Sequence, residues 1–225
     1  MVNDLKLAVK SLNYAYNLKV TVTVGMVVVL LCIMILIFGN PEAHFYFYGI
    51  YFLVVVGIFP VQLLYSLNAS NMVQASSVRK RMQTSAPAAL IFASMAAGYL
   101  VAALILGVRV LLRPQMGADA GRLLLSAVAF MVAIMLYTAI AYKYFIFATM
   151  CFVFTFVGLL NVGGSRVVGL FLSRLGGVEI PYLFAFLLGL AAIAAGAALN
   201  YLISLLVYKV PVSKKAQTAS LRKEM

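Results

Sequence analysis

The feature that most constrains this chain is a set of long runs that contain no charged residue. Such runs cover residues 20–41, 43–78, 82–108, 123–142, 144–165 and 180–208. The hydrocarbon core of a bilayer is about 30 Å thick, and a helix needs roughly 20 residues to cross it. Each run is long enough for one crossing, so the sequence predicts an integral membrane protein.

Composition excludes the soluble classes of protein. Of the 225 residues, 65% are hydrophobic and only 10% are charged, and the mean hydropathy is +1.09. A soluble domain carries about 25% charged residues, because its surface must be polar. The apolar runs are continuous rather than alternating, as in helices and not in barrel strands. We therefore expect an all-α fold with six transmembrane helices, near residues 20–38, 46–67, 88–110, 123–142, 145–162 and 181–208.

Local signals agree with these limits. Thr84 and Ser85 precede Pro87, which predicts a capped helix start with proline in the first turn. Pro60 lies inside the second span and predicts a kink, although many membrane helices tolerate proline. Small residues at four-residue spacing in the third and sixth spans predict close helix contacts. These rows are Ser94, Gly98 and Ala102, and Ala192, Gly196 and Asn200.

The distribution of charge predicts the orientation. Six spans place both termini on one side, which carries 12 of the 17 basic residues, including all nine lysines. Less Asp4 and Glu224, that side has a net charge of +10. The other side has five arginines, and less Glu42, Asp119 and Glu179 its net charge is +2. By the positive-inside rule both termini are cytoplasmic, and the net charge of +12 requires no nucleic-acid partner.

The sequence lacks the groups of residues that usually carry catalysis or bind metals. No Asp or Glu lies in the middle of a predicted span, which argues against a carrier coupled to protons or sodium. His44 is the single histidine, which is too few for a histidine-based metal site or protease dyad. The sequence has no acidic cluster for magnesium and no GxxxxGK[ST] motif. We expect no enzyme activity, cofactor or metal in this chain.

Two terminal segments flank the predicted membrane domain, residues 20–210. In residues 1–19 one helical stripe holds Leu5, Val9, Leu12 and Tyr16. This spacing predicts an amphipathic helix in the cytoplasmic interface, and the alternative is a simple charged leader. Residues 211–225 form a basic tail, which we expect in the cytoplasm.

The longest polar stretch inside the chain lies between the second and third spans, at residues 68–85. Its centre consists of Val73, Gln74, Ala75, Ser76, Ser77, Val78, Arg79, Lys80 and Arg81. We expect a short helix followed by a basic triplet, which offers a surface for a cytoplasmic partner. The alternative is that the triplet only enforces topology and contacts anionic lipid.

The segment before the sixth span, residues 163–180, is too apolar for an ordinary loop and too short to span. Glycine pairs bracket an apolar piece of about ten residues. We expect a re-entrant or interfacial segment, because uncovered irregular backbone is not stable in lipid. Its marker residues are Gly163, Gly164, Phe171, Gly176 and Gly177.

Few polar side chains lie deep in the predicted spans. They are Tyr99, Tyr137, Thr138, Thr155, Asn200 and Tyr201. These residues are candidates for lining a substrate path, although such groups more often hydrogen-bond a neighbouring helix.

The layout as a whole resembles the permease subunit of type-2 ATP-binding-cassette (ABC) exporters. The resemblance is architectural and covers essentially the entire chain. It consists of the interfacial helix, six spans, the inner loop after the second span, a tight inner hairpin at residues 141–144, and the re-entrant segment.

The resemblance implies that the chain pairs with a second copy or a similar permease, and that separate ATPase subunits bind ATP and magnesium. Residues 73–81 would then couple to the ATPase, and the segment with Gly163 and Gly177 would gate the outer end. Small members without an external domain resemble exporters of amphipathic peptides, and others move lipids or drugs. The implied location is the cell membrane of a bacterium.

Two other functions remain open. One is the membrane substrate-binding subunit of an ATPase-dependent vitamin importer, which requires a compact external ligand pocket. The other is a regulatory membrane protein without transport activity. Co-purification with an ATPase distinguishes the two transport hypotheses from the last.

Overall fold

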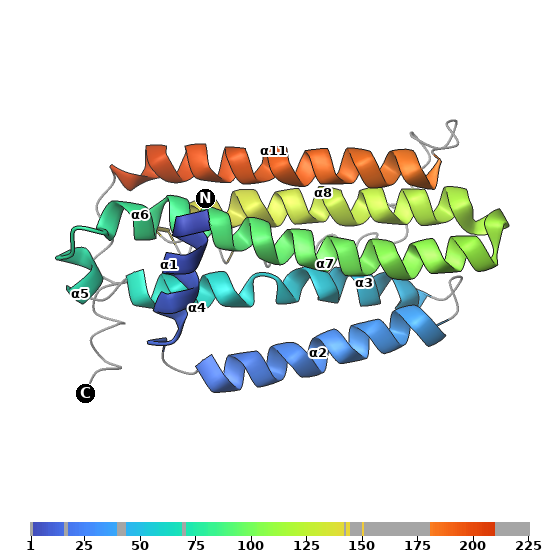
Figure 1. Ribbon diagram of the computed structural model, residues 1–225, viewed down its shortest axis with the longest axis horizontal. Helices are drawn as coiled ribbons and strands as arrows, with labels where there is room; N and C mark the ends of the chain where they lie inside the picture. The colour runs from blue at the N-terminus through green and yellow to red at the C-terminus, as the bar shows by residue number, and fades with distance from the viewer. Residues whose placement is uncertain are drawn as a thin grey trace.

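The computed structural model describes residues 2–15, 18–39, 44–68, 71–141, 143–144, 150 and 181–209. These residues form an elongated helical bundle (Figure 1). Four helices are long and apolar enough to cross a membrane, namely α2 (Leu18–Phe38), α7 (Ser85–Leu112), α8 (Gly117–Ala141) and α11 (Tyr182–Tyr208). They coincide with four of the predicted spans within a few residues, except that α8 begins at Gly117, before the predicted limit of residue 123.

The predicted second span is divided into α3 (His44–Val56) and α4 (Phe59–Asn68). Between them Gly57 and Ile58 form a turn, in which their amides bond to Val54 and Val55. The ring of Pro60 clashes with the carbonyl four residues earlier in a continuous helix and offers it no N–H. The expected kink is therefore a complete break, and Pro60 lies in the first turn of α4, where proline is tolerated.

The direction of the helices limits what connects them. The helices α7 and α8 are antiparallel, whereas α8 and α11 both begin at the end of the bundle opposite the N-terminus (Figure 1). The fifth predicted span, 145–162, would provide the return crossing. Apart from Met150 it lies outside the described residues, as do the predicted re-entrant segment 163–180 and the tail 211–225.

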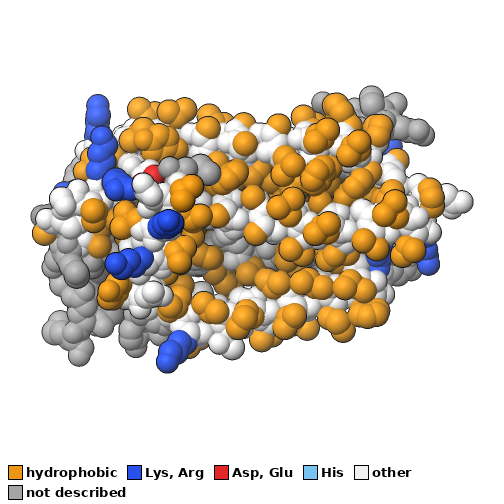
Figure 2. Space-filling model, in the orientation of Figure 1, with side chains coloured by type: hydrophobic (Ala, Val, Ile, Leu, Met, Phe, Trp, Pro, Cys, Tyr) orange, Lys and Arg blue, Asp and Glu red, His pale blue; other side chains and the backbone are white. Residues whose placement is uncertain are grey.

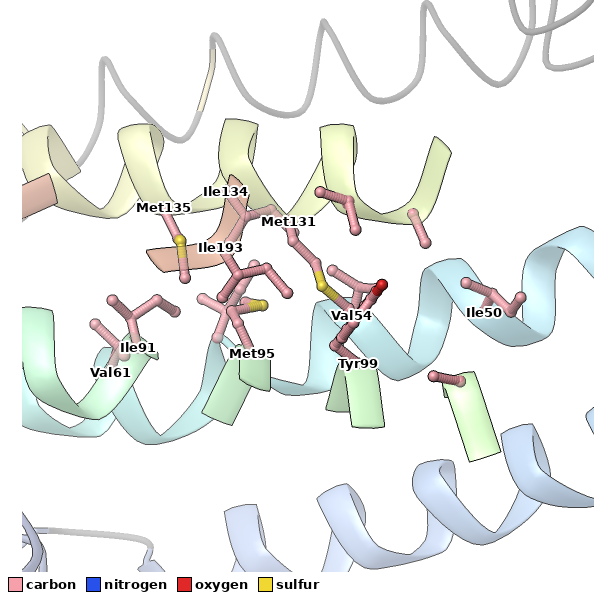
Figure 3. Packing of buried hydrophobic residues seen from close by; sticks show 14 of the residues in the cluster. Ile50, Val54, Val61, Ile91, Met95, Tyr99, Met131, Ile134, Met135 and Ile193 are labelled. Carbon is pink, nitrogen blue, oxygen red and sulfur yellow. The ribbon is translucent and has the colours of Figure 1, made fainter. Parts of the chain in front are cut away.

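The core lies between α3, α4, α7, α8 and α11. Figure 3 shows Val54, Met95, Met131 and Ile193 pointing into the space between these helices, and all four are buried. Helix α2 lies at the edge, packs mainly on α3 and leaves most of its apolar side chains exposed. In a bilayer such a surface faces lipid at no cost, so tight packing rather than water exclusion holds the helices together.

Two rows of small residues bring helices close together, as predicted. A Cβ atom on Gly196 of α11 would lie 2.9 Å from the Sδ atom of Met135 and 3.3 Å from Val132, both on α8. In the other row the Oγ atom of Ser94 on α7 donates to the carbonyl of Gly57 at 2.9 Å. That bond satisfies a polar group at the break between α3 and α4.

The start of α7 differs from the prediction in one respect. The helix begins at Ser85 with Pro87 in its first turn, but Thr84 forms no side-chain cap. Its Oγ atom donates instead to the carbonyl of Lys80 at 2.7 Å, because the short helix α6 (Arg79–Gln83) ends immediately before it. The two helices therefore run almost directly into one another.

The N-terminal helix α1 (Val2–Leu12) lies across one end of the bundle, beside α4 and α6 (Figure 1). The face toward the core contains Leu5, Ala8 and Leu12, and Ala8 is fully buried. Val9 is 52% exposed and Tyr16 lies outside the described residues, so of the predicted apolar stripe Leu5 and Leu12 pack on the core. The small Ala8 side chain permits a closer approach of α1 than Val9 would.

Charged and apolar side chains separate along the bundle axis. On the face in Figure 2, Lys and Arg gather at the two ends, with an apolar middle between them. The same view places more basic side chains at the end where α1 lies. We call this end, formed by α1, α6 and the last turns of α8 and α11, the inner end and the opposite one the outer end, as labels that follow the predicted orientation.

Candidate functional site

The predicted partner-binding loop lies at the inner end, between α4 and α7. It contains α5 (Asn71–Gln74) and α6, joined by a turn at residues 75–78. Ser76 forms this turn, because both its amide and its Oγ atom bond to the carbonyl of Val73, at 3.2 and 2.8 Å. Serine commonly competes for backbone groups in this way.

The small residues of this loop form the turn and the basic triplet lies in a helix, which differs from the expectation. A short helix was expected over the small residues and the triplet after it, yet Arg79, Lys80 and Arg81 themselves begin α6. Val73 and Val78 pack against the buried core. The loop is thus attached to the bundle by its two valines, and Lys80 and Arg81 are exposed.

An ion pair joins this loop to α1. The Nε and Nη2 atoms of Arg81 both donate to Oδ1 of Asp4, at 3.0 and 2.7 Å. The hydrogen bond from Arg81 lowers the pKa of the Asp4 carboxyl below its ordinary value, although burial opposes this shift. An exposed pair of this kind contributes little stability, so its main effect is to fix the position of α1 against α6.

The polar residues predicted to line a path are mostly hydrogen-bonded between helices. The Tyr99 hydroxyl on α7 donates to the carbonyl of Phe186 on α11 at 2.9 Å, and its ring stacks on that of Phe186. Gly189 makes room for the hydroxyl, since a Cβ atom there would collide with it. Tyr99 is fully buried (Figure 3) and therefore fastens α7 to α11.

A second polar contact joins α4, α8 and α11. The Nδ2 atom of Asn200 donates to Oγ1 of Thr138 at 3.0 Å and to the carbonyl of Met135. The hydroxyl of Tyr65 donates to the carbonyl of Thr138. Asn200 and Thr138 are buried, and Oδ1 of Asn200 has no partner among the described residues. We call this the Asn200 network.

The remaining candidates differ in their surroundings. Tyr137 is half-buried, Tyr201 is 39% exposed on α11, and Thr155 lies outside the described residues, as do Gly163, Gly164, Phe171, Gly176 and Gly177. Sequence reasoning missed Tyr65 and Tyr182, whose hydroxyls also donate to carbonyls of other helices. Both lie near span ends, where tyrosine is usually read as an interfacial residue.

A cavity of about 900 Å³ lies at the opposite, outer end, between the last turns of α2 and α7. Its lining is largely apolar and includes Phe38, Leu104 and Val108, together with Arg109 and Arg113. Arg109 closes one side, because its Nη2 atom donates to the carbonyls of Ile37 and Gly39 at 2.6 and 2.9 Å. The arginine thereby ties the end of α2 to α7.

Within the described ranges, no group of three or more His, Cys, Asp or Glu side chains is placed to hold a metal ion. No protein-family model, curated protein or solved structure matches the chain.

Proposed function

We propose that the chain is the transmembrane permease subunit of an ATP-driven ABC-type exporter. In this proposal it has six spans, both termini are cytoplasmic, and the membrane is the cell membrane of a bacterium. The observation that carries the proposal is the connection of α1, the loop and α7 at the inner end. The Asp4–Arg81 pair holds α1 against α6, and α6 continues almost directly into α7.

This connection provides a route by which a partner can move the spans. The exposed Lys80 and Arg81 lie where separate ATPase subunits, which bind ATP and magnesium, would contact the loop of residues 73–81. Because Val73 and Val78 pack on the core, a displaced loop shifts α7 rather than bending alone. The same displacement reaches α1 through Asp4.

The substrate path in this proposal lies between two permease copies, or between this chain and a similar one. The cargo class is an amphipathic peptide, a lipid or a drug. The segment of Gly163, Gly164, Phe171, Gly176 and Gly177 serves as the outer gate. Since Tyr99, Thr138 and Asn200 bond between helices of one chain, we assign them to structure rather than to cargo contact.

The first experiment is purification in mild detergent, followed by identification of any co-purifying ATPase. Replacing Val73–Val78 with glycine and serine should then uncouple ATP hydrolysis from transport without loss of membrane insertion. Replacement of Pro114–Met116, a turn at the outer end, is the control and should leave coupling intact. Unchanged coupling after the first replacement contradicts the proposal.

One observation favours a second candidate, the substrate-binding subunit of an ATPase-dependent importer. The outer cavity is the kind of pocket such a subunit requires. Such a subunit binds its ligand without the ATPase, and a Leu104→Trp variant would place a bulky ring in the cavity and weaken that binding. Ligand binding by the isolated chain, weakened in this variant, would favour the importer. A non-transport regulatory protein would bring no ATPase in the purification.

A further inference from the structure

The cavity at the outer end is a groove that opens to the outside of the bundle. Three of the side chains that line it, Phe38, Leu104 and Leu112, are 75%, 69% and 77% exposed. A closed cavity would bury its lining. Because the groove lies between two helices that are apolar and long enough to cross a membrane, the surroundings of its open side are lipid. Lipid molecules can therefore enter it from the side.

One face of α7 contributes a row of apolar side chains to this groove. Leu104, Val108 and Leu112 line it at four-residue spacing, so they share one face of the helix. At 1.5 Å per residue the row extends over about 12 Å along the helix axis. Phe38 lines the groove from α2. Such a surface suits a hydrocarbon chain that lies parallel to the helices.

Two arginines line the same groove. Arg109 and Arg113 are also four residues apart, so they form a basic row beside the apolar row. Arg109 holds the end of α2 through the carbonyls of Ile37 and Gly39. Arg113 is exposed, and its side chain forms no ion pair or hydrogen bond with the described residues. Its guanidinium is therefore accessible to a ligand in the groove.

Charge and depth indicate the chemistry of that ligand. The described residues that line the groove include no acid, and Asp119, the described acid at this end, pairs with Arg122. An anion in the groove is thus attracted to Arg113. This residue directly follows the end of α7, and Phe38 is the last residue of α2. The headgroups of a bilayer lie where the apolar helices end, and basic pockets between membrane helices bind them.

We propose that this groove binds one anionic phospholipid, with its phosphate on Arg113 and an acyl chain along Leu104 and Val108. The planar fork of arginine binds phosphate oxygens in pairs. A free anion would leave the apolar row uncovered, and a neutral lipid would bring no net charge to Arg113. Arg109 is a positioning residue, because it keeps Phe38 at the opposite wall. The groove lies within one chain, so this assignment does not rest on the exporter proposal.

The test uses the absence of tryptophan from the sequence, since a single introduced tryptophan is then a local fluorescence reporter. Phe38→Trp replaces one aromatic ring of the groove with another. The full chain is reconstituted in phosphatidylcholine vesicles that contain increasing fractions of phosphatidylglycerol or phosphatidylcholine with brominated acyl chains, which quench tryptophan on contact. We expect phosphatidylglycerol to associate about fivefold more strongly, as for one basic residue at an anionic surface.

Three variants serve as controls. Leu111→Trp places the reporter on the exposed surface of α7 beside the groove, so both lipids should quench it equally. Arg113→Gln in the Phe38→Trp background should remove the preference for phosphatidylglycerol. Arg122→Gln in the same background removes the same charge from the outer end and should leave the preference intact.

Several outcomes would overturn the proposal. Equal quenching of Phe38→Trp by the two lipids would mean that the groove takes any lipid or a free anion. The same preference at Leu111→Trp would indicate diffuse attraction, and a preference that survives Arg113→Gln would place the phosphate elsewhere. Quenching by neither lipid would mean that protein, such as a second copy, covers the groove. If Phe38→Trp does not fold, Leu112→Trp reports from the α7 wall and decides the result. The experiment needs no ATPase, so its failure leaves the exporter proposal standing.

Discussion

The carboxylate of Asp4 accepts two hydrogen bonds from the guanidinium of Arg81, which lies 77 residues further along the chain. This pair joins helix α1 to the loop helix α6. Both helices are short. The relative position of α1 and the loop therefore depends on this contact and on the packing of Leu5, Ala8 and Leu12.

Asp4→Asn should distinguish the contribution of the pair to stability from its contribution to transport coupling. We expect the free energy of unfolding to fall by less than about 1 kcal/mol, as for an exposed ion pair. If the exporter proposal holds, transport per ATP hydrolysed should fall by a larger factor. The matched control is Asp119→Asn, which removes the pair with Arg122 at the outer end. Equal effects of the two variants on coupling would contradict the role assigned to Asp4.

The same pair should give a dependence of stability on pH. The folded pKa of Asp4 is below its ordinary value of 3.8, so its contribution is present above that value. The contribution is lost as pH falls through the lowered pKa. The difference in melting temperature between wild type and Asp4→Asn should therefore be constant near neutral pH and shrink in acid. A difference that grows in acid would mean that the pair does not form.

Gly189 and Tyr99 should show strong energetic coupling. In Gly189→Ala the new methyl group would collide with the Tyr99 hydroxyl, which a rigid ring holds in place. We expect a loss of about 1–3 kcal/mol from overpacking, measured by thermal unfolding in detergent. Gly196→Ala should cost less, because the atom it meets is the flexible end of Met135. In Tyr99→Phe the hydroxyl is gone, so adding Gly189→Ala should then cost less than it does alone.

The Asn200 network should contribute measurably to stability. Asn200→Ala removes the bonds to Thr138 and Met135, and we expect a loss of about 0.5–2 kcal/mol, as for hydrogen bonds between membrane helices. Tyr201→Phe changes an exposed neighbour and should have no measurable effect. If both variants unfold like the wild type, the network does not hold α8 to α11.

The proposed topology can be tested with single cysteines. Cysteine at Ser77 should react with a membrane-impermeant thiol reagent only from the cytoplasm. Cysteine at Gly164 or Gly176 should react only from outside. The native Cys32 is buried and apolar helix surrounds it, so its background labelling should be low. The opposite pattern would reverse the orientation.

The spans were predictable because placing charge in a bilayer is expensive, so a run without charges marks a helix by itself. The helices α2, α7, α8 and α11 begin and end within a few residues of their predicted limits, apart from the early start of α8 at Gly117. The break in the second span was only partly predictable. Pro60 indicates a disturbance, but its place at Gly57 also depends on Ser94, which lies on another helix.

The roles of single polar residues could not be read from the sequence. Tyr99, Thr138 and Asn200 stand out because polar groups are rare in the spans, yet only packing decides between a path and an interhelical bond. The outer groove joins Phe38 and Arg113, which are 75 positions apart, so no local pattern indicates it. The same holds for Ala8, whose burial reflects the close approach of α1 to the bundle.

The break at Gly57 and Ile58 divides the predicted second span into two halves, α3 and α4. The outer half, α3, packs on α2, whereas the inner half, α4, contacts α1 and α6. A force on the inner end can therefore pivot α4 about the break while α3 keeps its place beside α2. The Gly57 carbonyl accepts a hydrogen bond from the Ser94 hydroxyl rather than from a helical amide. Such a pivot therefore need not unwind a helical turn, and Ser94 marks the point about which α3 and α4 can move relative to each other.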